Sequence, residues 1–431
     1  MNIWMVNHYA NHPSFPGGTR HYELARRLVD RGFDVSIICS SFHHKTHKPA
    51  REFRGALLVE DADGVQYVWV RARFAYSTNG LGRMLNMAEF AAQVRRLGGT
   101  RFRRSAAWPD VIIGSSPDLL TARAALGLAR RFGVPYVLEI RDLWPESLVE
   151  VGGFKAKHPL VRALEVLEKH LYRRADRIIS LMPEAWRRIE DVGVSRDKVV
   201  WISNGASASS HANTVQAAEK HDGFRLVYLG AFGRANVLDD LLSAAKLLGV
   251  DQPGIQIALV GDGTEKERLQ KRVATERIEN VVFEKPVPKG EVPKLLAGAD
   301  ATVALLEDSP LYRYGISLNK LFDYMAAGKP VLLAGHVAHD YVELAGCGIT
   351  VAPRSPEAIA EGVRMLARMS DDERESMGSK GREYLRKHHD WDLLVARLAD
   401  ILHELTSPHS PTTVASQCGP PGLKGTKVRL P

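Results

Sequence analysis

The sequence predicts an α/β protein made of two doubly wound, Rossmann-like domains that face a central cleft. Strand-like apolar runs alternate with helical patterns, which is typical of βαβ units and a parallel sheet. The alternation stops once, at residues 203–223, where Asn204-Gly205 and many small residues indicate a linker, and it then restarts. The chain has 431 residues, enough for two domains at roughly 100–200 residues each.

The first domain is expected over residues 1–205. A buried strand runs from Asn2 to Asn7, and a helix from Thr19 to Arg31 ends at Gly32, a residue typical of helix ends. The run Asp61-Ala62-Asp63-Gly64 predicts a hairpin turn; read as a metal-binding Asp-x-Asp pair, it would serve phosphate chemistry. Further strands are predicted at 35–39, 110–113, 136–140 and 177–181, and helices at 118–131 and 158–173.

The second domain is expected over residues 206–387. An amphipathic helix around Trp391, at about 388–405, follows it and is expected to join the first domain. Residues 406–431 are rich in Pro, Gly, Ser and Thr and are expected to be disordered. Strands are predicted at 226–230, 255–260, 281–283, 301–306 and 331–334, and helices at 237–248, 264–275, 288–297 and 318–327.

Composition excludes several classes of protein. Apolar residues are 45% and charged residues 25% of the chain, so it is not disordered as a whole, and no apolar run approaches the ~18–20 residues of a membrane-spanning helix. Cys39, Cys347 and Cys418 are too few and too far apart for a disulfide scaffold or a cysteine-built zinc site, so we expect a cytoplasmic protein. The net charge of +8 favours an anionic partner: phosphate, nucleic acid or an acidic membrane face.

Ligands of open α/β sheets bind beyond the carboxyl ends of the strands, so the loops there are the candidate sites. Gly17-Gly18, just before the first helix, would let a diphosphate approach the backbone, and a simple turn explains the pair equally well. In the loop from Gly230 to Asn236, Gly233 gives room, Arg234 can pair with phosphate, and Asn236 is expected to cap the next helix. Candidate contacts for a base or a phosphate, or else members of a turn, are Gly261 and Gly263.

The segment from Tyr314 to Pro330 is the most informative. Lys320 stands in the first turn of a predicted helix, where acids are usual, which makes sense if an anion binds at that end. Asp323 is three residues further and is expected on the same side. A lysine for phosphate and an acid for ribose hydroxyls form a coherent nucleotide pair; the alternative is a surface ion pair.

This segment resembles the donor-binding segment of family-four glycosyltransferases, in the bacterial surface-polysaccharide branch that includes fucosamine and N-acetyl-sugar transferases. The resemblance covers about residues 1–405. The other stretches that carry it are Gly17 to Ala25, Arg31 to Val35, Glu139 to Ser147 and Ser203-Asn204-Gly205.

The resemblance implies a GT-B fold and transfer of a hexosyl or N-acetylhexosaminyl group, with retention and without a metal or other cofactor. The C-terminal domain would bind a nucleotide-sugar, expected to be UDP-linked, and the N-terminal domain the acceptor. Many members carry two glutamates eight positions apart, and here Gly315 and Asp323 stand at those positions. Glu307 or Asp308 is a candidate to replace the first glutamate.

Such transfer separates a positive sugar carbon from a negative diphosphate, so fixed cations and N–H groups should lower the barrier. Arg234, Lys320 and the amides of Gly17-Gly18 are the candidates. With retention, the leaving phosphate can take the acceptor proton. Asp142, at a strand end, can orient the acceptor hydroxyl or face the cationic sugar; the alternative is a salt bridge with Arg141.

Residues 71–104 hold eight arginines and one acid, Glu89. Within them, an apolar stripe at helical spacing predicts a basic amphipathic helix on an anionic membrane face, where polyprenyl-diphosphate-linked acceptors would be found. The alternative is a helix that packs on its own sheet. The stripe is Leu81, Met84, Leu85, Ala88 and Ala92.

Two other functions compete with a transferase acting on a lipid-linked or saccharide acceptor. A sugar-nucleotide epimerase would use the same fold but needs paired acid and base groups. A basic nucleic-acid-binding protein would need exposed aromatics among the arginines, and Phe74, Tyr76, Phe90 and Phe102 are sparse, so no nucleic-acid partner is expected.

Overall fold

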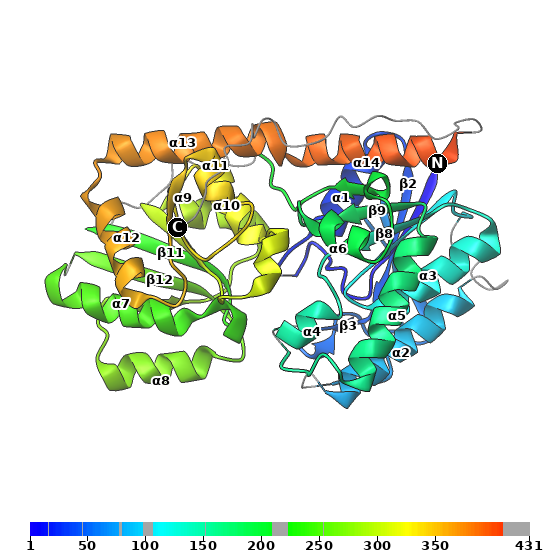
Figure 1. Cartoon of the computed structure of the whole chain (residues 1–431), viewed down its shortest axis with the longest axis horizontal. Coiled ribbons are helices and arrows are strands. Elements are labelled where there is room, and N and C mark those ends of the chain that lie inside the picture. The colour runs from blue at the N-terminus through cyan, green and yellow to red at the C-terminus, as the bar shows by residue number, and fades with distance from the viewer. Residues whose placement is uncertain are drawn as a thin grey trace.

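The computed structural model of the chain describes residues 1–15, 17–44, 46–76, 80–97, 107–150, 152–208, 223–252 and 254–407. Two α/β lobes stand side by side, and two consecutive helices run along one edge of both lobes (Figure 1). These helices are α13 (Asp371–His388) and α14 (Trp391–Thr406). The prediction of two α/β domains is therefore confirmed.

The N-terminal lobe is built on one sheet with the strand order β10-β9-β8-β7-β1-β2-β6-β5. Neighbouring strands run parallel except β5, which pairs antiparallel with β6 through the predicted hairpin. The strands are β1 (Asn2–Val6), β2 (Asp34–Ser40), β5 (Leu57–Ala62), β6 (Val65–Val70), β7 (Val111–Ser115), β8 (Tyr136–Ile140), β9 (Arg177–Ser180) and β10 (Val199–Trp201), with β3 (Phe42–His43) and β4 (Lys48–Pro49) as a separate pair. The helices are α1 (Arg20–Val29), α2 (Leu81–Arg96), α3 (Leu119–Phe132), α4 (Glu146–Glu150), α5 (Pro159–Arg174), α6 (Ala185–Asp191) and the short η2 (Arg196–Lys198).

Both faces of this sheet are buried. Trp4 and Val6 of β1 belong to a core shared with α3, whereas Ile3 and Met5 belong to a second core shared with α1 and α14. Successive residues of a strand face opposite sides of the sheet, so a strand covered on both sides needs apolar residues throughout. The two cores thereby fix the carboxyl end of β1, which His8 follows.

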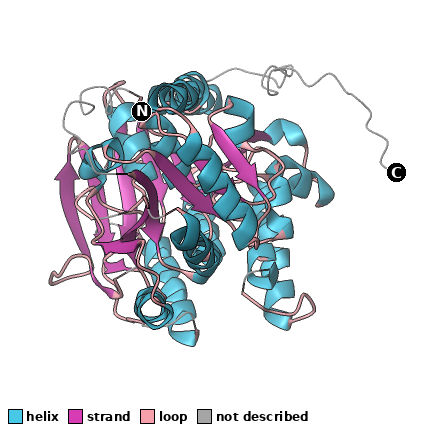
Figure 2. Cartoon of the chain, turned by 90° about the vertical axis from the view of Figure 1, so that its left-hand side faces the viewer, coloured by secondary structure: helices cyan, strands magenta, loops and turns pink. Residues whose placement is uncertain are grey.

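The C-terminal lobe is a six-stranded, wholly parallel sheet with the order β13-β12-β11-β14-β15-β16. Helices lie on both sides of the strands (Figure 2). The strands are β11 (Phe224–Ala231), β12 (Ile255–Asp262), β13 (Val281–Glu284), β14 (Ala301–Leu305), β15 (Val331–Ala334) and β16 (Gly348–Val351). The helices are η5 (Arg234–Asn236), α7 (Leu238–Asp251), α8 (Lys266–Glu276), η6 (Lys289–Glu291), α9 (Val292–Ala297), η7 (Pro310–Tyr314), α10 (Asn319–Ala326), α11 (Tyr341–Ala345) and α12 (Pro356–Arg368).

The last helix packs on the N-terminal lobe although it follows the C-terminal lobe in the chain. Trp391 and Leu394 of α14 lie in the same core as Leu24 of α1. Arg27 of α1 also forms an ion pair with Asp392 (3.1 Å). The two lobes are therefore joined twice, at residues 203–208 and at the junction between α13 and α14.

One predicted helix cap is wrong. Val237, and not Asn236, precedes α7, because η5 adds a short turn before the helix. The expected tail beyond residue 407 and residues 209–222 of the expected linker lie outside the described residues. In the part of the chain that the structure describes, no helix has the length and apolar character needed to cross a bilayer.

Candidate active site

Lys320 lies at the beginning of α10, at the carboxyl edge of the C-terminal sheet. Its ammonium group donates hydrogen bonds to the hydroxyl of Tyr228 (2.9 Å) and to Oδ1 of Asn236 (3.0 Å), and it stands 4.1 Å from the centre of the Tyr228 ring. Burial lowers the pKa of Lys320 to about 7. Within the described ranges, no carboxylate lies at ion-pair distance from this ammonium group. A buried cation without a counter-ion is a place where an anion can bind.

Gly17 and Gly18 of the N-terminal lobe lie beside the same helix end. A Cβ added at Gly18 would stand 2.6 Å from Nδ2 of Asn319, the residue before Lys320. Only a residue without a side chain fits there while Asn319 keeps its position. The glycine pair and the lysine, 300 residues apart in the sequence, are therefore brought together at the junction of the two lobes.

Gly261 and Gly263 allow neighbouring strand ends to approach each other. A Cβ at Gly261 would stand 1.9 Å from the carbonyl oxygen of Gly230, and one at Gly263 would stand 2.4 Å from that of Phe232. Both glycines have φ angles above +150°. Backbone packing thus accounts for them, in line with the turn interpretation of these two residues.

Arg234 extends into solvent, with 94% of its side chain exposed and its guanidinium 3.9 Å from the Glu265 carboxylate. It lines, with Gly233, a cavity of about 300 Å³ at the carboxyl edge of the sheet. On another wall of this cavity, Arg354 forms an ion pair with Glu307 (3.5 Å). Arg234 belongs to the same loop as Asn236, which contacts Lys320, but the Arg234 side chain lies beside Glu265 and does not contact Lys320.

Asp323 is directed elsewhere than Lys320. The residue is buried, and its carboxylate forms an ion pair with Lys289 of η6. Since Lys320 contacts Tyr228 and Asn236 instead, the two side chains do not form the pair expected from their spacing. Lys289 contacts only Oδ1 of Asp323, so a ribose hydroxyl that binds this carboxylate would do so beside the lysine.

Asp142 follows β8 on the N-terminal side of the junction, and its side chain is exposed. The surrounding residues remove water from the carboxyl and thereby raise its pKa, while the charges of Arg141 and Arg83 lower it. The salt bridge considered between Arg141 and Asp142 is not among the ion pairs of the described residues. The carboxylate thus remains available to a substrate.

The charge of this carboxylate acts on Tyr312 of the C-terminal lobe. Burial raises the pKa of Tyr312 to about 12, and the charges of Glu307 and Asp142 add to the effect. Glu307 belongs to the C-terminal lobe and Asp142 to the N-terminal lobe. The charges of carboxylates from both lobes therefore act on this one tyrosine.

His8 and Asp118 form a buried pair that the sequence analysis missed. Nδ1 of His8 lies 2.9 Å from Oδ2 of Asp118, and the imidazole is stacked between the rings of Tyr9 and Phe90. Asp118 already accepts the backbone N–H groups of Leu120 and Thr121 as the cap of α3. The hydrogen bond between Nδ1 of His8 and this carboxylate fixes the orientation of the imidazole ring. A histidine after the first strand and an aspartate before a helix were the available signals.

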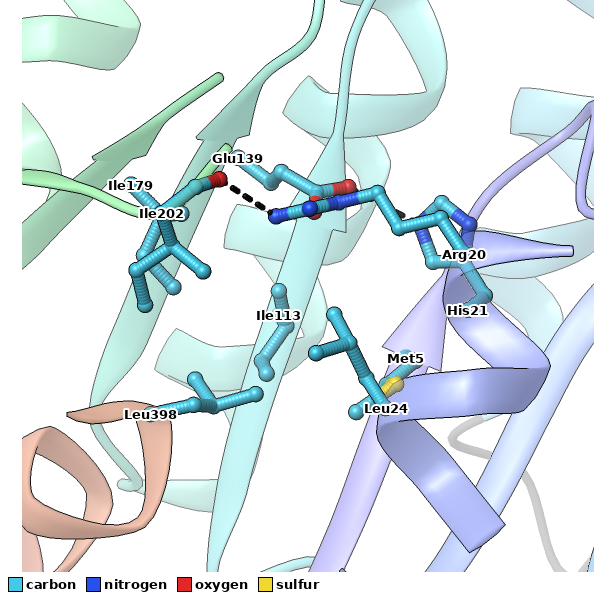
Figure 3. Close-up of a pocket in the computed structure, with 9 residues that line it drawn as sticks. All are labelled: Met5, Arg20, His21, Leu24, Ile113, Glu139, Ile179, Ile202 and Leu398. Atoms are coloured by element: carbon cyan, nitrogen blue, oxygen red, sulfur yellow. Dashed lines mark hydrogen bonds and ion pairs between the residues drawn. The ribbon is translucent and has the colours of Figure 1, made fainter. Parts of the chain in front are cut away.

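A second buried network joins residues that the sequence showed only as members of the stretches that carry the family resemblance. Arg20 donates to Glu139 (2.8 Å) and to the carbonyl oxygens of Ile202 (2.9 Å) and Ser203. His21 lies 2.8 Å from the same carboxylate, and Figure 3 shows Arg20, Glu139 and Ile202 around a small cavity. The ion pairs hold the pKa of Glu139 well below its usual range, despite its burial. The network ties α1, which begins just after Gly18, to the first connection between the lobes.

The predicted Asp-x-Asp turn serves the hairpin. Oδ1 of Asp61 accepts the backbone N–H of Gly64 (3.2 Å), and Asp63 accepts the hydroxyl of Tyr22. Over the residues that the structure describes, no three His, Cys, Asp or Glu side chains gather into a metal-binding group.

Comparison with known proteins identifies the family. Residues 17–205 match the Glycosyl transferase 4-like domain, and residues 211–384 match Glycosyl transferases group 1. The chain belongs to the family-four glycosyltransferases. The resemblance stated from the sequence motifs is thereby confirmed, and the two lobes are those of a GT-B fold.

This glycosyltransferase is similar to several known proteins. It is 24% identical over 309 residues to the probable glycosyltransferase WbjE of Pseudomonas aeruginosa, covering 69% of this chain and 75% of that protein. Its fold matches Anabaena Alr3699/HepE in complex with UDP-glucose, with a TM-score of 0.64, 14% identity and coverage of 94% and 100% of the two chains. It also matches WaaG, a glycosyltransferase involved in lipopolysaccharide biosynthesis, with a TM-score of 0.66, 16% identity and coverage of 93% and 99%.

The structure accounts for a glycine at position 315, where the family resemblance led to the expectation of a glutamate. Gly315 has a φ of +88°, and a Cβ there would stand 2.6 Å from the ring of Pro183 in the N-terminal lobe. The preceding Tyr314 is buried in the core of that lobe, and its carbonyl accepts the N–H of Glu184 (3.0 Å). Arg313 forms an ion pair with Glu146 (2.6 Å). The segment η7 is thus a strap between the lobes and leaves no room for the glutamate.

Of the two acids considered as replacements for that glutamate, Glu307 lines the cavity near Arg234, whereas Asp308 is exposed and lies 3.5 Å from His336.

Proposed function

We propose that this glycosyltransferase moves a hexosyl or N-acetylhexosaminyl group from a UDP-linked donor to a lipid-linked or saccharide acceptor of a bacterial surface polysaccharide. The observation that carries the proposal is Lys320 at a helix N-terminus, whose buried ammonium group has no carboxylate partner in the described part of the chain. The printed descriptions of two relatives, one bound to UDP-glucose and one active in lipopolysaccharide biosynthesis, support the donor and the product class.

The first role of the protein is to stabilise the leaving diphosphate. When the bond between the anomeric carbon and the diphosphate oxygen breaks, its electron pair passes to that oxygen, and negative charge grows there. Lys320 and the free N–H groups of α10 face this charge, and Arg234 joins them by rotation of its exposed side chain. Gly17-Gly18 closes the site from the N-terminal lobe.

The second role is to place the acceptor. A bond forms between the acceptor oxygen and the anomeric carbon on the face that the diphosphate leaves, so the configuration is retained. The acceptor proton passes to the leaving phosphate oxygen, which requires neither a nucleophile from the protein nor a metal ion. Asp142 orients the acceptor hydroxyl and faces the positive sugar.

Helix α2 provides a surface suited to a membrane that carries acidic lipids. Met87, Phe90 and Val94 pack into the lobe, while the opposite side exposes Leu81 (75% exposed), Met84 and Leu85. Arg83 follows Leu81 in the first turn of the same helix, and exposed arginines occur before α2 and in its last turn, so the region as a whole complements anionic lipid headgroups. We propose that the enzyme docks by this face on the inner side of the cell membrane, as a peripheral cytoplasmic protein. The described part of the predicted arginine cluster is Arg71, Arg73, Arg83, Arg95 and Arg96, whereas Arg101, Arg103 and Arg104 lie outside the described residues.

A labelled nucleotide-sugar panel tests the proposal. Each donor is incubated alone, with a lipid-linked acceptor, and with a free saccharide acceptor. We expect one UDP-sugar to be consumed with transfer of its label only when acceptor is present. Formation of an epimer from the donor alone would favour a sugar-nucleotide epimerase, and a salt-sensitive shift of random oligonucleotides would favour a nucleic-acid-binding protein.

A further inference from the structure

Arg141 carries a charge that the fold leaves unused. It follows β8 at the carboxyl edge of the N-terminal sheet, where its backbone N–H donates to Oγ of Ser116 (2.8 Å). Its Nε is buried and has no hydrogen-bond partner, and no ion pair of its guanidinium occurs among the residues of the described ranges. Since a partly buried arginine is normally paired, this one is available to an anion.

Arg83 brings a second positive charge to the same region. It belongs to the first turn of α2, where its Nε donates to the hydroxyl of Tyr9 (3.2 Å) and its guanidinium lies 5.4 Å from the centre of that ring. The charges of both arginines act on the carboxyl of Asp142. Tyr9, which Arg83 contacts, follows β1, and Arg141 and Asp142 follow β8. These two parallel strands are separated only by β7, so both arginines lie at the same edge of the sheet as the carboxylate that is proposed to orient the acceptor hydroxyl.

The position of Arg83 connects this region to the exposed face of α2. Leu81 and Met84 are its close neighbours in the chain and are exposed to solvent. An amphiphile that lies along these apolar side chains therefore presents its polar end to Arg83. Beyond that end, a sugar would extend toward Asp142.

We propose that Arg83 and Arg141 bind the diphosphate of a lipid-linked acceptor sugar, whose hydrocarbon chain lies along Leu81 and Met84. The inference rests on the proposed function, since it assigns the acceptor end of the same reaction. It assigns an anion site in the N-terminal lobe that is separate from the donor site at Lys320. The lipid diphosphate is chosen over a free phosphate because the charged groups and the exposed apolar side chains adjoin.

Direct binding tests the site without any need for transfer. Farnesyl diphosphate, farnesol and inorganic pyrophosphate are each titrated into the full chain and its variants by calorimetry. We expect farnesyl diphosphate to bind the wild type and K320A equally and to bind R141Q and R83Q at least about tenfold more weakly, since each variant loses one charged contact. R130Q, which removes an exposed arginine at the end of α3, should bind like the wild type.

Each other result has a defined meaning. Equal binding of farnesyl diphosphate by R141Q, R83Q and the wild type overturns the inference, and so does loss of binding in K320A alone. Pyrophosphate that binds as tightly as farnesyl diphosphate overturns the choice of a lipid. If these titrations succeed while no nucleotide-sugar is consumed, the proposed transfer fails and the anion site stands.

Discussion

Asn319 of the C-terminal lobe and Gly18 of the N-terminal lobe touch so closely that a Cβ on Gly18 would stand 2.6 Å from the Asn319 amide nitrogen. This contact joins the loop before α1 to the first turn of α10, next to Lys320. It makes the proposed donor site depend on the relative position of two lobes that pack around separate cores.

Substitution at Gly18 should therefore impair donor binding. We expect G18V to raise the donor KM by about tenfold or more, because a branched side chain forces the loop away from α10. In the double variant G18V/N319A, part of the affinity should return, since the shortened side chain vacates the space. Steady-state kinetics checks this, and a G18V enzyme with unchanged donor KM would contradict the contact's role.

Removal of the Lys320 charge should lower the catalytic efficiency strongly and leave the protein folded. We expect K320A to lower kcat/KM by about 100-fold or more, as is typical when a group that stabilises developing charge is removed. R234A should also lower it, since the exposed guanidinium is proposed to rotate toward the diphosphate. Circular dichroism should show both variants folded, and near-normal activity in both would remove the site assignment.

The lowered pKa of Lys320 predicts a pH dependence of donor affinity. Burial lowers the pKa to about 7 in the free protein. A bound diphosphate favours the charged form, so binding above pH 7 must take up a proton, and affinity should fall as the pH rises. The donor KM should increase by up to about tenfold per pH unit above 7 and flatten below it. K320R, which stays protonated, should lose this dependence; an identical profile in K320R would assign it to another group.

A glutamate at position 315, as the family resemblance would lead one to expect, should destabilise the protein. Gly315 combines a left-handed backbone with close contact to Pro183, so G315E and G315A should each destabilise it by about 1–3 kcal/mol. Thermal unfolding measures the effect. Gly290 is a matched control because a Cβ there meets nothing within 4 Å, so G290A should be nearly neutral. Equal melting temperatures for G315A and the wild type would show that the strap does not constrain this residue.

The membrane face of α2 can be tested with vesicles. The double variant L81S/L85S should lose binding to vesicles with anionic lipids while donor KM stays unchanged, because these side chains are exposed and lie outside the donor site. Sedimentation with anionic and with neutral vesicles gives the comparison. Equal sedimentation of the variant and the wild type would assign membrane binding, if any, to another surface.

Periodicity predicted the architecture well because the central strands of both sheets are buried on both faces and most of the long helices on one. Periodicity did not predict the partner of a side chain that can bond to any of several residues close in space. Asn236 has the residue type of a helix cap, yet a short turn moves the helix start and leaves its Oδ1 for Lys320. The spacing of Lys320 and Asp323 indicated a shared face, but Lys289, from a distant segment, pairs with the aspartate.

The same limit applies to side-chain pairs whose two members are far apart in the sequence. His8 owes its ring orientation to Asp118, 110 residues away, and no neighbouring residue in the sequence indicates this pairing. The exposed stripe of α2 was visible in the pattern of apolar residues, but only the packing of Phe90 and Val94 shows that the stripe faces outward. Sequence patterns identify candidate residues, whereas their partners follow from the fold.

Calorimetric titration of UDP into the wild type and K320A tests the central claim most directly. The account predicts that the wild type binds UDP and takes up protons at pH 8, and that K320A binds at least about tenfold more weakly without proton uptake. Equal affinity and equal proton uptake in the two proteins would contradict the claim that Lys320 holds the donor diphosphate.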